Sequence, residues 1–151
     1  MGSEMCIRDR NLGGIYQELG QLDQALASTL KSLELNPDNP SAYINLGGIY
    51  KELGQFDQAL ASTLKSLELK PDNFSAYINL AEIYKDLGRL AEAEINSRKA
   101  VFLKSDSSEA HLLLGDILLK LGKHEEGLKE NLTGGGIMVF NLSNGLSVKR
   151  N

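Results

Sequence analysis

Two histidines are the residues of this chain best suited to acid–base or metal chemistry. His111 and His124 are its only histidines, and they lie about one helix length apart. No cysteine stands near them, and no pair of carboxylates joins them at the spacing that a zinc site or an acid–base pair requires. The sequence therefore predicts no metal site and no catalytic site here.

The other motifs that suggest chemistry are incomplete. Cys6 is the only cysteine, which excludes an internal disulfide and is typical of a reducing, cytoplasmic compartment. The glycines at 134–136 lack the following Lys-Ser/Thr of a phosphate-binding loop. The triplets at 131–133 and 141–143 match the glycosylation acceptor pattern, which also arises by chance. We therefore expect a protein that is not an enzyme and holds no cofactor.

The composition gives no sign of a nucleic-acid or membrane partner. Hydrophobic residues make up 42% of the 151 residues and charged residues 24%, and the formal net charge is −4. An acidic chain is not typical of nucleic-acid or anionic-membrane binding, and its apolar runs are too short to cross a bilayer. We expect one cytoplasmic domain with a protein or peptide partner.

An internal repeat of 34 residues organises the chain. Residues 11–39 and 45–73 align without a gap and differ at three positions. The segment "YINLGGIYKELG" at 43–54 returns as "YINLAEIYKDLG" at 77–88 and more faintly as "HLLLGDILLKLG" at 111–122. Self-similarity at a fixed period indicates a repeat architecture.

Each copy has the pattern of two helices joined by a turn. Apolar residues recur every three or four positions in two stripes, which is the period of an amphipathic helix. Gly54 is expected to end the first helix in a left-handed conformation, and Pro71 to follow the end of the second. Asn39 is expected to cap the next helix, with Pro40 at its first position. The first stripe is Tyr43, Leu46, Ile49, Tyr50 and Leu53, and the second is Phe56, Ala59, Leu60, Thr63, Leu64 and Leu67.

Three ladders of small residues recur in step with the repeat. Small side chains let two helix backbones approach closely, so the ladders are predicted to mark the contacts within and between hairpins. This explains the first glycine of the "NLGGIY" segments at 11–16 and 45–50, but not the second, whose later equivalents are Glu82 and Asp116. The ladders are Gly13, Gly47, Ala81, Gly115; Ala25, Ala59, Ala93, Gly127; and Ser32, Ser66, Ala100, Gly134.

The chain resembles the tetratricopeptide repeat family. The resemblance rests on an aromatic residue, Leu-Gly, Tyr, a turn Gly, a spaced Ala and a closing Pro, which are Tyr43, Leu46-Gly47, Tyr50, Gly54, Ala59 and Pro71. It implies an all-α fold, a right-handed α-solenoid of antiparallel helix hairpins with about 3.5 repeats. The array is expected over residues 11–133, with repeats at about 6–39, 40–73, 74–107 and, partially, 108–133. In this register His111 replaces Tyr43 and Tyr77 as a packed aromatic side chain, and His124 begins the last helix in an exposed position.

Both ends depart from the repeat. Residues 1–10 are expected to be non-native or disordered, because "MGSE" is typical of a cloning remnant and "MCIRDR" of translated adapter sequence. Asp9 replaces the tyrosine of later repeats, so the first helix is expected to fray. Residues 134–151 form a Gly-rich linker and tail in which Asn144-Gly145 is a two-residue turn signal for a β-hairpin. This tail is either a hairpin or the truncated start of a further domain.

The family resemblance implies a concave groove, lined by the first helix of each repeat, that holds a peptide or a partner helix. Asn11, Asn45 and Asn79 would form a ladder of amides toward a peptide backbone, and Ile44 and Ile78 would be apolar anchors. Ile44 and Ser75 stand where a carboxylate clamp would need cations, which argues against that variant of the groove. The implied groove residues are Asn11, Gly14, Gln17, Ser41, Ile44, Asn45, Gly48, Lys51, Glu52, Ser75, Ile78, Asn79, Glu82, Lys85, Asp86, Leu112, Asp116 and Lys120.

The second glycine and the overall role are open to more than one interpretation. Gly14 and Gly48 either bare the groove backbone to a ligand or are tolerated residues copied in a recent duplication. The main functional prediction is a non-catalytic protein–protein interaction scaffold. The alternatives are a regulatory or targeting arm of a larger enzyme that continues beyond residue 151, and a module that self-associates weakly through its uncapped C-terminal end.

Overall fold

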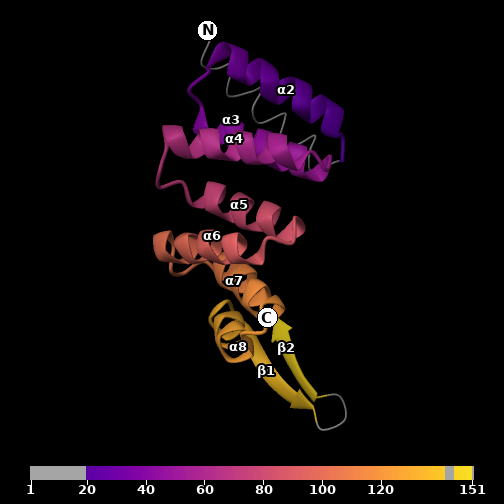
Figure 1. The fold of residues 1–151 in the computed structure, drawn as a ribbon, viewed down its shortest axis with the longest axis vertical. Helices are drawn as coiled ribbons and strands as arrows, with labels where there is room; N and C mark the ends of the chain where they lie inside the picture. Colours follow the sequence, from indigo (N-terminus) through magenta and orange to yellow (C-terminus); the bar gives the residue numbers. More distant parts are fainter. Residues whose placement is uncertain (1–19, 142–144, 151) are drawn as a thin grey trace. The chain divides into compact units, whose positions relative to one another are not determined.

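The computed structural model describes residues 20–141 and 145–150, and the side chains of residues 20–135. The described chain consists of seven helices followed by two strands (Figure 1). The helices are α2 (Leu22–Leu35), α3 (Pro40–Glu52), α4 (Phe56–Leu69), α5 (Phe74–Asp86), α6 (Leu90–Leu103), α7 (Ser108–Lys120) and α8 (His124–Thr133); the strands are β1 (Gly136–Asn141) and β2 (Gly145–Arg150).

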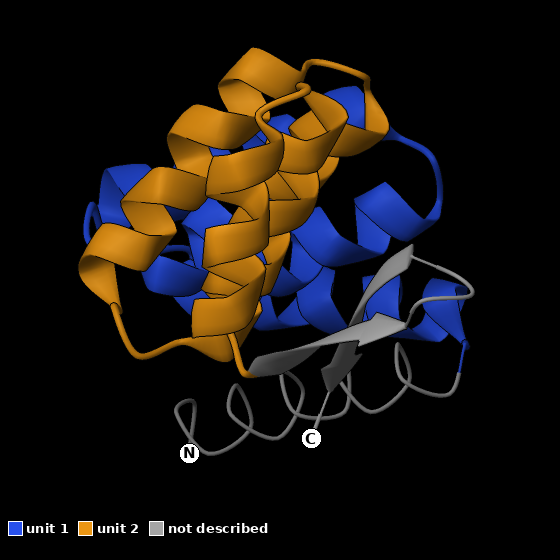
Figure 2. Ribbon diagram, turned by 90° about the horizontal axis from the view of Figure 1, so that it is seen from below, with its two compact units in different colours: residues 1–79 blue, residues 80–151 orange. Residues whose placement is uncertain are grey.

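The chain divides into two compact units, residues 1–79 and 80–151, and the division falls within α5 (Figure 2). In the first unit, α3 packs against both α2 and α4. In the second unit, α7 packs against both α6 and α8, and β1 lies against α8. Consecutive helices therefore pack as hairpins in each unit, as the repeat pattern predicts.

Glycine ends each of the first helices that the structure describes, as predicted. Gly54 follows α3 with φ of 73°, a left-handed conformation that costs glycine little. The Gln55 backbone N–H donates to the Tyr50 carbonyl (2.8 Å) and the Gly54 N–H to the Lys51 carbonyl (3.0 Å). These two bonds form a Schellman motif, which satisfies carbonyls at the helix end. The positive φ angles of Gly88 and Gly122 repeat this turn after α5 and α7.

Polar caps fix the starts of two first helices that lie two repeats apart. The Asn39 side chain accepts a hydrogen bond from the Ala42 backbone N–H (3.3 Å), and Pro40 is the first residue of α3. Ser107 makes the equivalent bond with the Ala110 N–H (3.3 Å) at the start of α7. A side-chain oxygen at this position satisfies one of the helix's orphan donors. The predicted Asn39 cap is therefore confirmed.

The small-residue ladders face the interior, as predicted. The alanines and serines of the ladders are fully buried, and their described glycines are buried as well. Gly13 lies outside the described residues. The confirmed positions are Gly47, Ala81, Gly115; Ala25, Ala59, Ala93, Gly127; and Ser32, Ser66, Ala100, Gly134.

Contacts at the glycines show which helices come close. A Cβ atom on Gly115 of α7 would lie 2.9 Å from the Gly127 carbonyl oxygen of α8, and one on Gly127 would lie 2.9 Å from the Gly115 carbonyl oxygen. The two backbones therefore touch where both residues lack a side chain. A Cβ atom on Gly47 of α3 would meet the Thr63 hydroxyl of α4 and would lie 3.3 Å from the Ala59 carbonyl oxygen. The first two ladders thus mark the contact between the helices of one hairpin.

The C-terminal segment forms the expected hairpin in a different register. Strands β1 and β2 pair antiparallel, with Phe140 opposite Leu146 and Asn141 opposite Gly145. A two-residue turn centred on Asn144-Gly145 would instead have placed Leu146 opposite Ser143. The predicted turn is therefore wrong, because Gly145 belongs to β2, while Asn144 lies outside the described residues.

The contact between Gly47 and Thr63 generates a prediction, because a larger side chain at one position requires a smaller one at the other. Thr63 is fixed there because its hydroxyl donates to the Ala59 carbonyl (2.8 Å), four residues earlier. We expect Gly47→Ala to lower the free energy of unfolding by about 1–2 kcal/mol, because overpacking in a buried contact outweighs the gain of about 1 kcal/mol in helix propensity.

The third repeat supplies the compensating change. It has Ala81 and Ser97 at the equivalent positions, and the Ser97 hydroxyl donates to the Glu94 carbonyl (3.0 Å), only three residues earlier. Adding Thr63→Ser to Gly47→Ala frees the hydroxyl to turn away, so the pair should recover part of the loss. A double-mutant cycle in urea measures the coupling; strictly additive effects would contradict this account.

Candidate functional site

The positions implied for a groove lie on α3, α5 and α7, the first helices of their hairpins. We call the described members the A-helix surface and treat its two portions, one in each unit, separately. Asn11, Gly14 and Gln17 lie outside the described residues. Ser41, Glu52, Ser75, Asp86 and Lys120 are exposed. Half-buried positions are Ile44, Asn45, Gly48, Lys51, Asn79, Glu82, Lys85, Leu112 and Asp116.

In the first unit the structure joins two of the predicted residues. The Asn79 side-chain amide of α5 donates a hydrogen bond to the Ile44 backbone carbonyl of α3 (3.2 Å). This bond connects the first helices of successive hairpins. The amide therefore has a structural role, and a ligand would compete with the Ile44 carbonyl for this donor.

Burial removes one predicted apolar anchor. Ile78 exposes only 5% of its surface, so it belongs to the core and offers a partner almost no contact area. The prediction that Ile78 is an apolar anchor is therefore wrong. Ile44 on α3 is half-buried and keeps apolar surface exposed.

In the second unit three predicted residues form a row of charges. The Asp116 carboxylate of α7 lies 3.3 Å from the Lys85 ammonium of α5 and 3.6 Å from the Lys120 ammonium one turn further along α7. Two cations thus share one carboxylate on this portion of the A-helix surface. Leu112 is covered in part, because a Cβ atom on Gly134 would lie 2.9 Å from its Cγ.

His111 is a buried link between α7 and α8. It exposes 7% of its surface, and its Nε2 lies 2.9 Å from the Ser105 backbone carbonyl. Tyr77 makes the equivalent contact one repeat earlier, where its hydroxyl donates to the Pro71 carbonyl (3.1 Å). The prediction that His111 replaces a packed aromatic residue is consistent with this burial and with the shared bond.

The same histidine has a second partner that the sequence did not predict. Its Nδ1 lies 2.6 Å from a carboxylate oxygen of Glu130 on α8. Since a carbonyl and an ionised carboxylate both accept, this geometry suits a ring with both nitrogens protonated. Burial lowers the pKa of His111, but the hydrogen bonds to Glu130 and Ser105 and the Glu130 charge outweigh it and raise the pKa above its ordinary value.

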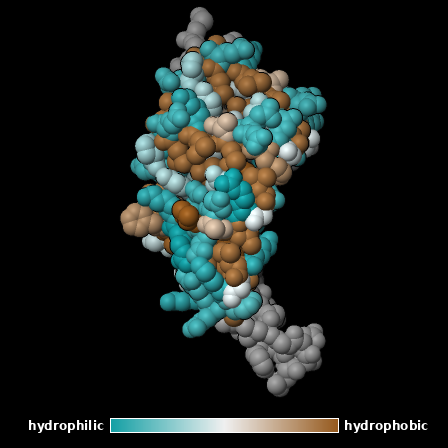
Figure 3. Space-filling view, viewed as in Figure 1, coloured by the Kyte–Doolittle hydropathy of each residue, from teal (hydrophilic) through white to brown (hydrophobic). Residues whose placement is uncertain are grey.

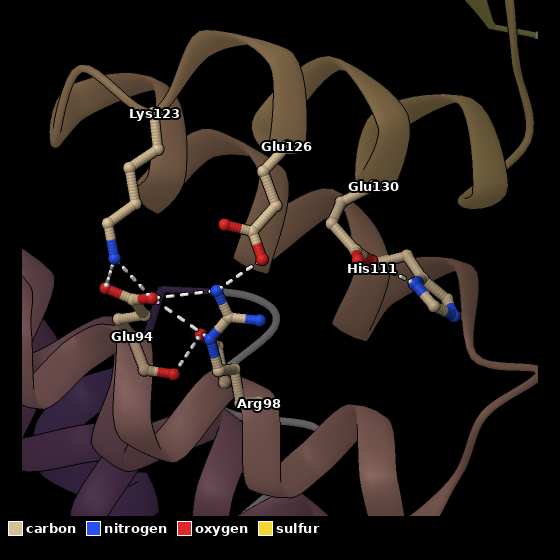
Figure 4. A network of polar contacts seen from close by, with 7 residues as sticks. Glu94, Arg98, His111, Lys123, Glu126 and Glu130 are labelled. Carbon is tan, nitrogen blue, oxygen red and sulfur yellow. Dashed lines mark hydrogen bonds and ion pairs between the residues drawn. The ribbon is translucent and has the colours of Figure 1, made fainter.

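A four-residue ion-pair network joins α6 to the start of α8 (Figure 4). The Lys123 ammonium lies 2.8 Å from both carboxylate oxygens of Glu94. The Arg98 guanidinium lies 2.8 Å from Glu94 and 2.6 Å from Glu126. The hydrogen bond from Lys123, opposed by burial and aided by Arg98, lowers the pKa of Glu94.

A substitution pattern in the sequence could have revealed this network. Glu94 and Arg98 occupy the positions that Leu60 and Leu64 hold one repeat earlier. The simultaneous change of two leucines into opposite charges, four residues apart on a helix, indicates an ion pair. The third repeat therefore has charged residues at two positions where the second repeat has leucine, whereas the small-residue ladders are retained.

The remaining features do not point to a reaction centre. Among the described residues, no group of three or more His, Cys, Asp or Glu side chains is arranged to hold a metal ion. None of the described helices is both long and apolar enough to cross a bilayer. An open pocket of about 440 Å³ at the start of α8 has none of the predicted groove residues among its described lining, which is Lys123, His124, Glu125, Glu126 and Lys129.

Comparisons with known families settle the architecture. A family profile described as "TPR repeat" matches residues 13–54 and 47–88, and one described as "Tetratricopeptide repeat" matches residues 74–106. Together these matches span more than half of the chain. The chain belongs to the tetratricopeptide repeat family. The hairpins described above are therefore units of an all-α helical-repeat solenoid.

Solved structures with the same fold support this assignment. "MamA MSR-1 C2" is 26% identical, with a TM-score of 0.66, and the match covers 83% of this chain and 72% of that one. "MamA 41-end from Desulfovibrio magneticus RS-1" is 21% identical, with a TM-score of 0.74 and coverages of 85% and 73%. "First TPR of Spaghetti (RPAP3) bound to HSP90 peptide SRMEEVD" is 23% identical, with a TM-score of 0.73 and coverages of 80% and 95%. A comparison with curated proteins found no match.

The His111–Glu130 pair makes stability depend on pH in a defined direction. Because the folded-state pKa of His111 is raised, its contribution to stability is complete below the unfolded pKa of about 6.5 and is lost as pH rises through the folded value. We expect the free energy of unfolding, measured in urea, to fall between mildly acidic and mildly alkaline pH.

Two variants identify the residues responsible. His111→Tyr, which restores the residue type of Tyr77, should remove this pH dependence while keeping the bond to the Ser105 carbonyl. Glu130→Gln should return the pKa of His111, followed by NMR of the ring protons, toward its ordinary value. An unchanged pH profile in both variants would show that another group titrates.

Proposed function

We propose that this protein is a non-catalytic interaction module that binds a peptide or a helix of a partner protein on its A-helix surface. The observation that carries the proposal is the row of charges Lys85, Asp116 and Lys120, which is partly exposed on the first helices. Family membership supports the same class of function. A cytoplasmic location, expected from the single cysteine, stays a prediction.

The charges of the second unit favour a polar ligand. Lys120 exposes half of its side chain and shares Asp116 with Lys85. A carboxylate on a ligand would meet two lysine ammonium groups that lie on either side of the Asp116 carboxylate. The related Spaghetti domain was solved with an HSP90 peptide whose printed sequence, SRMEEVD, is rich in acidic residues. By analogy, a peptide with acidic side chains suits this portion of the surface.

The portion in the first unit combines an apolar and a polar contact. Ile44 gives partly exposed apolar surface next to Asn45 and near the Asn79 amide. A peptide backbone could take the Asn79 donor from the Ile44 carbonyl at little enthalpic cost, since one acceptor replaces another. An apolar ligand side chain over Ile44 would then supply affinity, with the amides setting register.

The lysine pair tests this proposal directly. Peptides selected by display against the whole chain are titrated against the Lys85→Gln, Lys120→Gln double variant. We expect affinity for acidic peptides to fall about tenfold or more, in line with the loss of two charge-assisted contacts. Lys65→Gln is the matched control, because Lys65 is a similar exposed lysine on α4, a second helix.

Two results would contradict the proposal. One is equal loss of affinity in the Lys65 control, which would indicate a general charge effect. The other is selection of peptides that bind the double variant as tightly as the original chain. Either result would move the binding site away from the A-helix surface.

Gly48 provides a separate prediction. It is half-buried inside α3, where alanine is about 1 kcal/mol more favourable than glycine. Gly48→Ala should therefore raise the free energy of unfolding by about 1 kcal/mol. The repeat pattern predicts the same for Gly14, which lies outside the described residues, so adding Gly14→Ala is expected to bring the gain to about 2 kcal/mol. Urea unfolding measures this gain. If the selected peptides bind the double variant with unchanged affinity, the glycines have no role in ligand approach and are a relic of duplication.

A further inference from the structure

The outer face of α6 carries the two most exposed large apolar side chains of the described chain. Ile95 exposes 67% of its surface and Phe102 exposes 78%. They lie two helical turns apart, so they share one face of α6. The other exposed large apolar residues of the described part expose no more than 46%. Apolar surface of this kind is stabilised when a partner covers it.

The other repeats show that the fold does not require these side chains. One repeat earlier, α4 has Ala61 and Glu68 at the equivalent positions, and α2 has Ala27 and Glu34. α4 forms its hairpin with α3 with a small residue and a charged residue there. The packing of α6 against its neighbours depends instead on the buried small residues on the opposite side of the helix, Ala93 and Ala100. The third repeat has therefore gained apolar surface that its own packing does not use.

The same exchange has changed the partner of a lysine. In α4, the Lys65 ammonium lies 2.7 Å from the Glu68 carboxylate. In α6, the equivalent Lys99 has Phe102 in place of that glutamate, and its ammonium lies 5.1 Å from the centroid of the Phe102 ring. Among the described residues, Lys99 forms no ion pair. A cation next to apolar surface is thus left without a carboxylate.

The neighbouring charges do not supply that carboxylate. Glu94 and Glu126 are both held by Arg98, and Glu94 is also held by Lys123. Glu92, nearer the start of α6, is paired with Arg89 (2.7 Å). The exposed ammonium of Lys99 is therefore available to a carboxylate from outside this set of residues. Charge complementarity favours an acidic partner over a basic one.

We propose that Ile95, Lys99 and Phe102 form a second interaction surface, the α6 face, which binds a partner-protein segment with apolar side chains next to carboxylates. An apolar side chain packs over Ile95 and Phe102, and a carboxylate reaches the Lys99 ammonium. This surface lies on a second helix and is distinct from the A-helix surface on the first helices. Figure 3 shows one face of the protein, where apolar areas are interspersed with hydrophilic ones.

The test uses two synthetic amphipathic peptides as probes. Both carry leucine with the helical spacing i, i+3, i+4 and i+7; one has glutamate at its flanking positions and the other has lysine. Each is added to the whole, isotope-labelled chain, and backbone amide shifts are followed by NMR. We expect the glutamate peptide to shift the amides of residues 95–102 and the lysine peptide to leave them unchanged.

A variant that copies the second repeat keeps the fold and removes the face. Ile95→Ala with Phe102→Glu restores the residue types of Ala61 and Glu68, so that Lys99 regains an i+3 carboxylate. We expect this variant to unfold at the same urea concentration as the original chain or a higher one, and to bind the glutamate peptide about tenfold more weakly or worse. Leu64→Ala, which removes an exposed leucine from α4, is the matched control and should bind normally.

Three outcomes would overturn the proposal. The first is no shift in α6 with the glutamate peptide, or equal shifts with both peptides. The second is shifts confined to α3, α5 and α7, which would assign the peptide to the A-helix surface. The third is a dimer in sedimentation experiments that Phe102→Glu abolishes, which would make a second copy of this chain the occupant of the α6 face.

Discussion

Close approach of neighbouring helices is the physical constraint on which the rest of this structure depends. Where Gly115 and Gly127 meet, neither residue has a side chain, and each backbone occupies the space that the other leaves. Dense packing of this kind tolerates little change in volume. The polar contacts are built on this spacing, because the 2.6 Å bond between His111 and Glu130 requires α7 and α8 to lie this close. Loss of the small residues would therefore break the polar links as well.

The two units use the same ladders but differ in what surrounds them. In the first unit, Leu60 and Leu64 stand on α4 at positions that Glu94 and Arg98 occupy on α6 in the second. Apolar contacts depend mainly on area, whereas ion pairs also depend on direction. The second unit thus has contacts that fix α8 to α6 and α7 in one geometry. Because the buried ladders hold the hairpin together, the residue types at outer and groove positions can differ between repeats while the hairpin is kept.

The hairpins were predictable because their determinants are local and periodic. Apolar spacing defines the helices, Gly54 and its equivalents end them, and Asn39 begins one. Features that depend on long-range pairing were not predictable. The register of β1 and β2 follows from which residues meet across the pair, so the local Asn144-Gly145 signal misplaced the turn. The array boundaries at residues 11 and 133 stay a prediction.

The candidate site was predictable only as a set of positions. Periodicity places Ile78 on a first helix, but its burial depends on neighbours that the sequence does not identify, so its anchor role was wrong. Glu130 lies nineteen residues from His111 with no pattern to connect them, and the pair was missed. Differences between equivalent positions of the repeats were informative about side-chain contacts. The change from Leu60 and Leu64 to Glu94 and Arg98, for example, marks a position where an ion pair replaces apolar side chains.

The ionic connection of α8 to α6 gives the solenoid a nearest-neighbour coupling that dissolved electrolyte can weaken. In a repeat protein, each unit is held by its own stability and by its interface with the next one. Mobile ions screen the charges of Lys123, Arg98 and Glu126, which are partly exposed, but hardly affect fully buried alanine contacts. Raising ionic strength should therefore loosen α8 from α6 before it disturbs the contacts between the buried ladders.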